Sequence, residues 1–163
     1  MLVVSHVMSL NGLVIPLEKL AAETSRRGIY LIVDGAHAVG ALPLAGGIFQ
    51  NVDGYAGNLH KWMMAPKGTG FAWVHPRRQS DLRPSQGSWT IFETPQSQGD
   101  FAPGHRFAQQ MLQSSCQDFS SWFAIKDTCD FWDQIGPEVI RQRIDFLKNK
   151  LRTGLRELGW QDL

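Results

Sequence analysis

A strand–helix–strand pattern at the start of the chain limits its fold more than any other feature. Residues 2–7 form a nearly continuous apolar run rich in valine, which is typical of a strand buried on both faces of a sheet. Pro16 and an apolar repeat at helical spacing predict a helix that stops at Gly28, and residues 29–33 predict a second buried strand. Two strands joined through a helix in about 30 residues form a right-handed βαβ unit, so we expect a parallel sheet.

Further elements extend this pattern along the chain. Residues 52–57 and 70–74 predict two more strands, and their short connection predicts that they pair as a hairpin. From residue 75 to about 104 the chain is rich in Pro, Gly, Gln and Ser, which predicts a long irregular segment. The expected fold class is therefore α/β, with a mainly parallel sheet and flanking helices.

Two amphipathic helices are predicted after the irregular segment, separated by Gly136 and Pro137. Asp118 is expected to cap the first one. Its inner apolar stripe is expected to contain Trp122, Ile125, Cys129 and Trp132. The stripe of the second contains Ile140, Ile144, Leu147, Leu151, Leu155 and Leu158. A stripe of this length requires a protein partner.

Composition and charge argue against several classes of protein. The formal charge is +1 and most basic residues are spread along the 163 residues, so nothing indicates a nucleic-acid partner. Cys116 and Cys129 have neither CxxC spacing nor a matching histidine, which argues against a zinc site and a disulfide framework. The opening residues lack the basic start and cleavage site of a signal peptide, and the apolar runs are shorter than the roughly 20 residues that span a bilayer. We therefore expect a soluble, cytoplasmic protein.

Several polar residues follow the predicted strands, where open parallel sheets bind their ligands. Asp34 comes directly after a buried strand, so we expect a partly desolvated carboxylate that needs a partner, although it could instead cap the next turn. His37 and His6 lie near the same edge, and each could be structural. Lys61 follows His60 just before a glycine-rich turn, where a lysine is suited to a covalent bond with a carbonyl compound, although it could be an exposed loop lysine.

An acid, an imidazole and a lysine at neighbouring strand ends match what pyridoxal phosphate requires. Three segments, residues 33–40, 55–62 and 65–71, resemble class V aminotransferases, and the resemblance extends from Ser5 to about Gly159. They are most similar to the isopenicillin N epimerase-like branch and more distantly similar to cysteine desulfurases. The resemblance implies the large domain of the aspartate-aminotransferase-type fold and a small-molecule amino-acid substrate.

The resemblance also implies roles for individual residues. Asp34 pairs with the pyridine nitrogen of pyridoxal 5'-phosphate, and Lys61 holds the cofactor as a Schiff base. Four further positions match cofactor-binding positions: His37 and Ser9 near the phenolic oxygen of the ring, and Asn58 and His60 near the phosphate. Removal of the α-proton can lead to epimerisation, elimination or transamination, and these outcomes stay open.

By the same resemblance the chain is a partial one. Residues 1–135 correspond to the C-terminal half of the cofactor-binding large domain, and residues 136–163 form a long helix that leads toward a small domain. The phosphate loop, the aromatic residue that stacks on the cofactor and the arginine that binds the substrate carboxylate fall outside the chain. We expect a homodimer when the protein is full length. Ser115 and Cys116 stand where relatives have Gly-Thr, which contacts the partner's cofactor.

Two other functions remain open. A cysteine desulfurase or selenocysteine lyase needs a catalytic cysteine on a mobile loop, and neither Cys116 nor Cys129 is predicted to lie on one. A non-catalytic remnant could instead bind a partner through an exposed sheet edge and helix. We expect the truncated chain to be inactive by itself.

Overall fold

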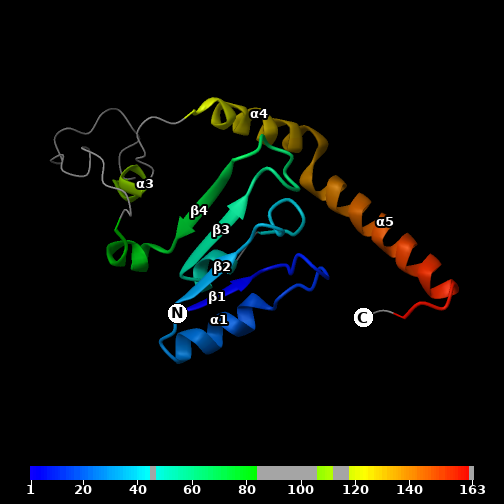
Figure 1. The fold of residues 1–163 in the computed structure, drawn as a ribbon, viewed down its shortest axis with the longest axis horizontal. Helices are drawn as coiled ribbons and strands as arrows, with labels where there is room; N and C mark the ends of the chain where they lie inside the picture. Colours follow the sequence, from blue (N-terminus) through cyan, green and yellow to red (C-terminus); the bar gives the residue numbers. More distant parts are fainter. Residues whose placement is uncertain (45–46, 84–105, 112–117, 162–163) are drawn as a thin grey trace.

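A four-stranded sheet forms the centre of the molecule (Figure 1). The computed structural model describes residues 1–44, 47–83, 106–111 and 118–161. The strands lie in the order β1 (Leu2–Ser5), β2 (Leu31–Asp34), β3 (Gly54–Asn58), β4 (Gly70–Val74). The first three are parallel and β4 is antiparallel to β3, which confirms the predicted βαβ unit and hairpin.

Helix α1 (Leu17–Arg26) makes the crossover between β1 and β2. It follows Pro16, as predicted, because a proline lacks only an N–H that the first turn leaves unpaired. Gly28 ends it with a φ of 65°, a conformation that costs glycine little. The helix packs its apolar face into a core cluster that consists of Leu17, Ala21, Leu31, Val33, Val39, Val52 and Tyr55.

The strands differ from the prediction at their ends. β1 stops at Ser5, because Val7 already bends back to form an isolated bridge with Val14. β2 starts two residues later than predicted, because Ile29 still pairs with the last turn of α1: its amide donates a hydrogen bond to the carbonyl oxygen of Thr24. β3 begins at Gly54 instead of residue 52, after a short helix α2 (Ile48–Asn51) that the sequence did not suggest.

The predicted irregular segment is wrong at its start, where residues 76–81 form the 3₁₀ helix η1 (Pro76–Asp81). Asp53 explains this helix: its buried carboxylate accepts hydrogen bonds from Arg77, Arg78 and the amide of Leu31. One carboxylate thus joins the starts of β2 and β3 to η1. Residues 84–105 lie outside the described part of the chain.

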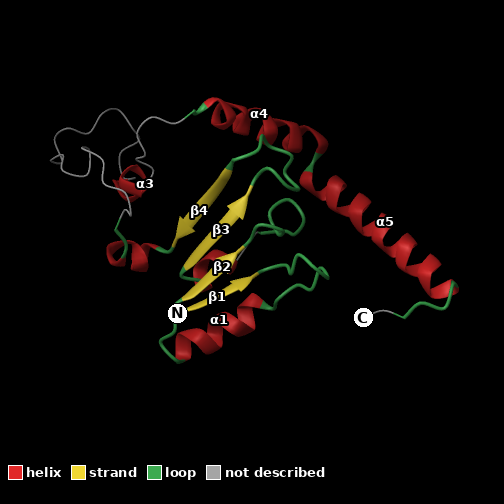
Figure 2. Ribbon diagram, in the orientation of Figure 1, coloured by secondary structure: helices red, strands yellow, loops and turns green. Residues whose placement is uncertain are grey.

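The C-terminal helices form an arm beside the sheet (Figure 2). After α3 (Arg106–Met111), α4 (Ser120–Ile135) and α5 (Pro137–Glu157) follow; we call α4 and α5 the helical arm. Asp118 accepts a hydrogen bond from the amide of Ser120, but Phe119 occupies the N-cap position of α4, so the predicted cap lies one residue too early. Gly136, with a φ of 90°, separates the two helices.

The inner stripe predicted for α4 is wrong in its extent. Trp132 is the only buried side chain in the described residues of the helical arm, and Cys129 and Trp122 are exposed. Figure 1 shows α5 projecting away from the sheet, and within the described part of the chain most of its predicted apolar stripe is exposed. The division into domains at residues 135 and 136 stays a prediction. Across the described ranges, no helix has the length and apolarity needed to cross a membrane.

Candidate functional site

The candidate site lies at the edge of the sheet where the parallel strands end. Asp34 is the last residue of β2 and Asn58 the last of β3, while Ser5 at the end of β1 pairs with Asp34. The loops that carry His37 and Lys61 begin at this same edge. The structure therefore brings together the strand ends that the βαβ pattern predicted to be neighbours.

Lys61 and His37 are in direct contact. The side-chain nitrogen Nζ of Lys61 lies 3.0 Å from Nε2 of His37, although the residues are 24 positions apart. Both side chains are half-buried. A lysine amine held by an imidazole has fewer accessible orientations than a free surface lysine, so the contact fixes where its nitrogen points.

Three glycines allow the two loops to approach so closely. At Gly40, which has a φ of 80°, an added Cβ would lie 2.9 Å from the backbone nitrogen of Met63, in the loop that carries Lys61. At Gly57 an added Cβ would lie 2.5 Å from a methyl group of Val39. At Gly35 it would lie 2.1 Å from the ring of Tyr55. Because these glycines have no side chain, the turn after Asp34 can pack closely on Tyr55 and on the loop that carries Lys61.

The exposure of Asp34 differs from the prediction. Its carboxylate is exposed, so the expected partial desolvation is wrong. The reason is that Asp34 is the final residue of β2, and its Oδ1 accepts a hydrogen bond of 2.9 Å from the amide of Ala36. The turn-capping alternative is therefore correct for one oxygen. Among the residues that the structure describes, Oδ2 has no hydrogen-bond partner and stays available for a ligand.

Beneath this edge lies a buried pair that the sequence did not indicate. The hydroxyl of Tyr55, whose side chain is 1% exposed, is 3.0 Å from Nδ1 of His6. Burial and the nearby charge of Asp34 raise the pKa of Tyr55 to about 12, and burial lowers the pKa of His6. The one available sequence signal was a tyrosine at a core-facing strand position, because a buried hydroxyl needs a partner. The structural interpretation of His6 agrees with this contact.

The other predicted residues occupy different surroundings. His60 lies within 3.1 Å of the carbonyl oxygen of Thr69, so it holds the two ends of the hairpin loop together. Asn58 is half-buried at the end of β3. Ser9 lies in an exposed turn, and within the described ranges no hydrogen bond joins it to the lysine, His37 or Asp34. Ser115 and Cys116 fall outside the described residues.

The described residues contain no group of His, Cys, Asp and Glu that could hold a metal ion. What the edge offers instead is an amine, an imidazole and an exposed carboxylate, placed above a buried tyrosine. An amine of this kind can bond covalently to a carbonyl group, and the carboxylate can accept a hydrogen bond from a protonated ring nitrogen.

Comparison with protein families gives one match over nearly the whole chain. Residues 1–162 match the family model of class V aminotransferases. The isopenicillin N epimerase of Streptomyces clavuligerus is 40% identical over 144 residues, which are 85% of this chain and 36% of that protein. The isopenicillin N epimerase of Amycolatopsis lactamdurans is 33% identical over 98% of this chain and 40% of its own length. The chain thus spans less than half the length of these relatives.

Solved structures show the same fold at lower identity. A cysteine desulfurase from Thermococcus onnurineus superposes with a TM-score of 0.77 at 19% identity, over 96% of this chain and 38% of its own. A structure of C-DES with glycine covalently linked to its PLP cofactor gives a TM-score of 0.79 at 24% identity, over 96% of this chain and 41% of its own. These likenesses show that the sheet and its helices have the same fold as about two fifths of each of those chains.

Proposed function

Because the chain belongs to the class V aminotransferase family, whose members use pyridoxal phosphate, we propose that it is the lysine-bearing part of an enzyme that acts on an amino acid. The observation that carries the proposal is the contact of 3.0 Å between Lys61 Nζ and His37 Nε2, at the sheet edge where Asp34 ends β2. The identities of 40% and 33% to isopenicillin N epimerases favour an epimerase-like enzyme.

The residues at this edge fit pyridoxal phosphate. Lys61 supplies an amine for the aldehyde of the cofactor, and Asp34 supplies a free carboxylate oxygen for the ring nitrogen. Gly35 lets the turn beside Asp34 pack directly on the ring of Tyr55, because an added Cβ there would collide with that ring. The roles of His37 at the phenolic oxygen and of Asn58, His60 and Ser9 toward the cofactor come from the resemblance alone.

When bound, pyridoxal phosphate would supply an electron sink that makes the α-proton of an attached amino acid easier to remove. Asp34 would hold a proton on the ring nitrogen through its carboxylate. Lys61 Nζ, once the substrate has replaced it, would be the base that takes up the α-proton. His37 Nε2 would accept a hydrogen bond from Lys61 Nζ and keep that amine aimed at the reacting carbon.

The whole enzyme is proposed to be a homodimer that acts on an amino acid as its small-molecule substrate. A cysteine desulfurase or selenocysteine lyase is the second candidate, because relatives named probable cysteine desulfurases also match, at 24% and 35% identity. Cys129 lies on helix α4 and not on a loop, which argues against it as a sulfur-accepting cysteine. The lower identity over the longer of these two matches, 24% over 97% of the chain, also places this candidate second.

Exchange of the α-proton tests the proposal without naming the substrate. We use the whole protein, meaning this chain together with any segments that its gene encodes on either side. Incubated in deuterated water with pyridoxal phosphate and a set of amino acids, it should exchange the α-proton of at least one of them, as measured by NMR. Lys61→Ala should abolish the exchange, whereas Lys67→Ala, a matched change in the same loop, should preserve it. Exchange that survives Lys61→Ala would refute the proposal.

A further inference from the structure

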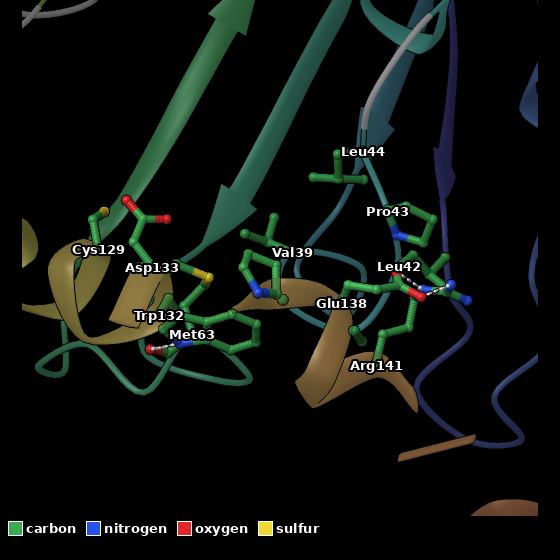
Figure 3. Close-up of a pocket in the computed structure, with 13 residues that line it drawn as sticks. Val39, Leu42, Pro43, Leu44, Met63, Cys129, Trp132, Asp133, Glu138 and Arg141 are labelled. Atoms are coloured by element: carbon green, nitrogen blue, oxygen red, sulfur yellow. Dashed lines mark hydrogen bonds and ion pairs between the residues drawn. The ribbon is translucent and has the colours of Figure 1, made fainter. Parts of the chain in front are cut away.

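The helical arm and the Lys61 loop, residues 59–69, are joined by one hydrogen bond. The indole Nε1 of Trp132 donates to the carbonyl oxygen of Met63 at 3.0 Å, across 69 positions of sequence. Figure 3 shows this bond between the indole and the loop backbone. Trp132 is 6% exposed and is the only buried side chain among the described residues of α4 and α5. The one buried residue of the arm is thus directed at the loop that carries the proposed catalytic lysine.

The remaining backbone hydrogen bonds close the loop on itself or on its hairpin. The amide of Met64 donates to the carbonyl of Lys61, and the amide of Ala65 donates to the carbonyl of Leu59. Met64 has a φ of 61°, which is unfavourable for a residue with a side chain, so the surroundings have to hold the turn in this shape. Met63 lies between these constraints, two residues from Lys61.

Met63 lies between a close backbone contact on one side and the helical arm on the other. On one side, the backbone of Met63 rests on Gly40, where even one added carbon would be too close. On the arm side there is a cavity of about 450 Å³; its lining includes apolar side chains such as Val39, Leu42 and Trp132, and the charged residues Asp133, Glu138 and Arg141. Met63 packs against the core cluster, and the cavity lies where Met63 faces the arm (Figure 3). The indole hydrogen bond is the directional restraint that the arm adds to this packing.

We propose that Trp132 is a positioning residue: it holds the backbone of the Lys61 loop so that Lys61 Nζ stays against His37 Nε2. The proposal rests on the function proposed for Lys61, and it adds that the helical arm sets the place of the lysine. A shift at Met63 moves Lys61 because only one residue lies between them. Displacements of about 1 Å at a reacting group are enough to slow a reaction strongly.

Trp132→Phe in the whole protein tests the proposal, because it keeps an aromatic ring and removes the N–H donor. Trp122→Phe is the matched control, since Trp122 lies on the same helix and is exposed. The first measurement is hydrogen exchange of the loop amides without cofactor. Trp132→Phe should speed the exchange of the Met64 and Ala65 amides by about fivefold or more, and the amides of the sheet should be unaffected. Trp122→Phe should leave all of them unchanged.

The second measurement is the rate at which pyridoxal phosphate becomes fixed on Lys61 after borohydride reduction, followed by peptide mapping. Trp132→Phe should slow it several-fold. If loop exchange is unchanged, or if exchange rises and labelling of Lys61 does not fall, the proposal is wrong. If even the unaltered protein takes no label, the proposed function fails, while loop exchange still reports whether Trp132 holds the loop.

A second variant covers the case in which Trp132→Phe does not fold. Benzothienylalanine at position 132 has nearly the shape of tryptophan and replaces the N–H by sulfur, so packing is kept and only the donor is lost. It should reproduce the faster loop exchange and the slower labelling. Behaviour like that of the unaltered protein would overturn the proposal.

Discussion

The sheet and the helical arm both carry large apolar side chains, yet they bury them to different extents. In the sheet, Leu31 and Val33 are 0% exposed and pack against α1 in a continuous core. On α5, Leu151 is 63% exposed, and Leu158, just after the helix, is 77% exposed. A strand and its crossover helix can bury one another within the chain, whereas an isolated helix has one apolar face and no second layer to cover it.

The two regions are also held together by different forces. The arm carries ion pairs within single helices, such as Glu138 with Arg141 and Asp145 with Lys148, which are exposed and stabilise a helix only slightly. The sheet side has a buried carboxylate, Asp53, whose partners come from two separate elements, β2 and η1. Stability should therefore be concentrated in residues 1–83, with the arm contributing little except at Trp132.

The largest expected difference is between two leucine truncations in the 163-residue chain. Leu31→Ala should lower the free energy of unfolding by about 3 kcal/mol, because it leaves a cavity in the core. Leu151→Ala should lower it by less than about 0.5 kcal/mol, because the side chain is already exposed. Urea denaturation followed by circular dichroism measures both. Similar losses for the two variants would mean that a partner covers the arm in solution.

A smaller effect is expected at Asp53. Asp53→Asn should cost about 2 kcal/mol, because Arg77 and Arg78 lose a buried partner while the Leu31 amide can still be satisfied. The control Asp145→Asn removes an exposed ion pair on α5 and should change little. If the control costs as much as Asp53→Asn, the proposed concentration of stability in the sheet is incorrect.

Asp53 should also affect how steeply the free energy of unfolding decreases at acid pH. Burial opposes the charge of Asp53, but hydrogen bonds from Arg78, the Leu31 amide and Arg77 outweigh it and lower its pKa below the ordinary 3.8. A lowered carboxyl pKa contributes stability that is present above the ordinary value and is lost as the pH falls through the folded value. Denaturation midpoints measured from pH 5 downward should therefore fall less steeply in Asp53→Asn than in the unaltered chain.

The smallest expected effect is at the buried pair under the site. Tyr55→Phe should cost about 1 kcal/mol at neutral pH through its lost hydrogen bond to His6. The folded pKa of Tyr55 is about 12 against an ordinary 10.0, so its contribution is present below pH 10 and is lost as the pH rises toward 12. Denaturation at a series of alkaline pH values should show a shallower decline in Tyr55→Phe. An unchanged slope would mean that the hydroxyl is not buried as described.

The elements that the sequence predicted well are those whose signals are local. The spacing of apolar residues after Pro16 and the glycine stop at Gly28 placed α1, and the strand pattern placed β4 at its observed residues. The helix η1 was missed because it depends on Asp53, which is more than 20 residues away. A long-range ion pair leaves no periodic signal in a composition of Pro, Gly, Gln and Ser.

The candidate site was predictable in outline for a similar reason. Strand order and the rule that ligands lie beyond parallel strand ends placed Asp34, His37 and Lys61 at one edge. No sequence pattern predicts that Lys61 contacts His37 or that Trp132 bonds to Met63, because both contacts depend on how loops pack. The exposure of Asp34 was mispredicted because it depends on where β2 ends.

The central claim is that Lys61 is the lysine that carries pyridoxal phosphate. Borohydride reduction of the whole protein after incubation with pyridoxal phosphate, followed by peptide mapping, tests it most directly, because reduction fixes the cofactor on the lysine that held it. We expect label on Lys61, which is half-buried and in contact with His37. Lys67 is exposed in a turn only six residues on and is the nearest competitor. Label on Lys67, or no label on any lysine, would contradict the claim.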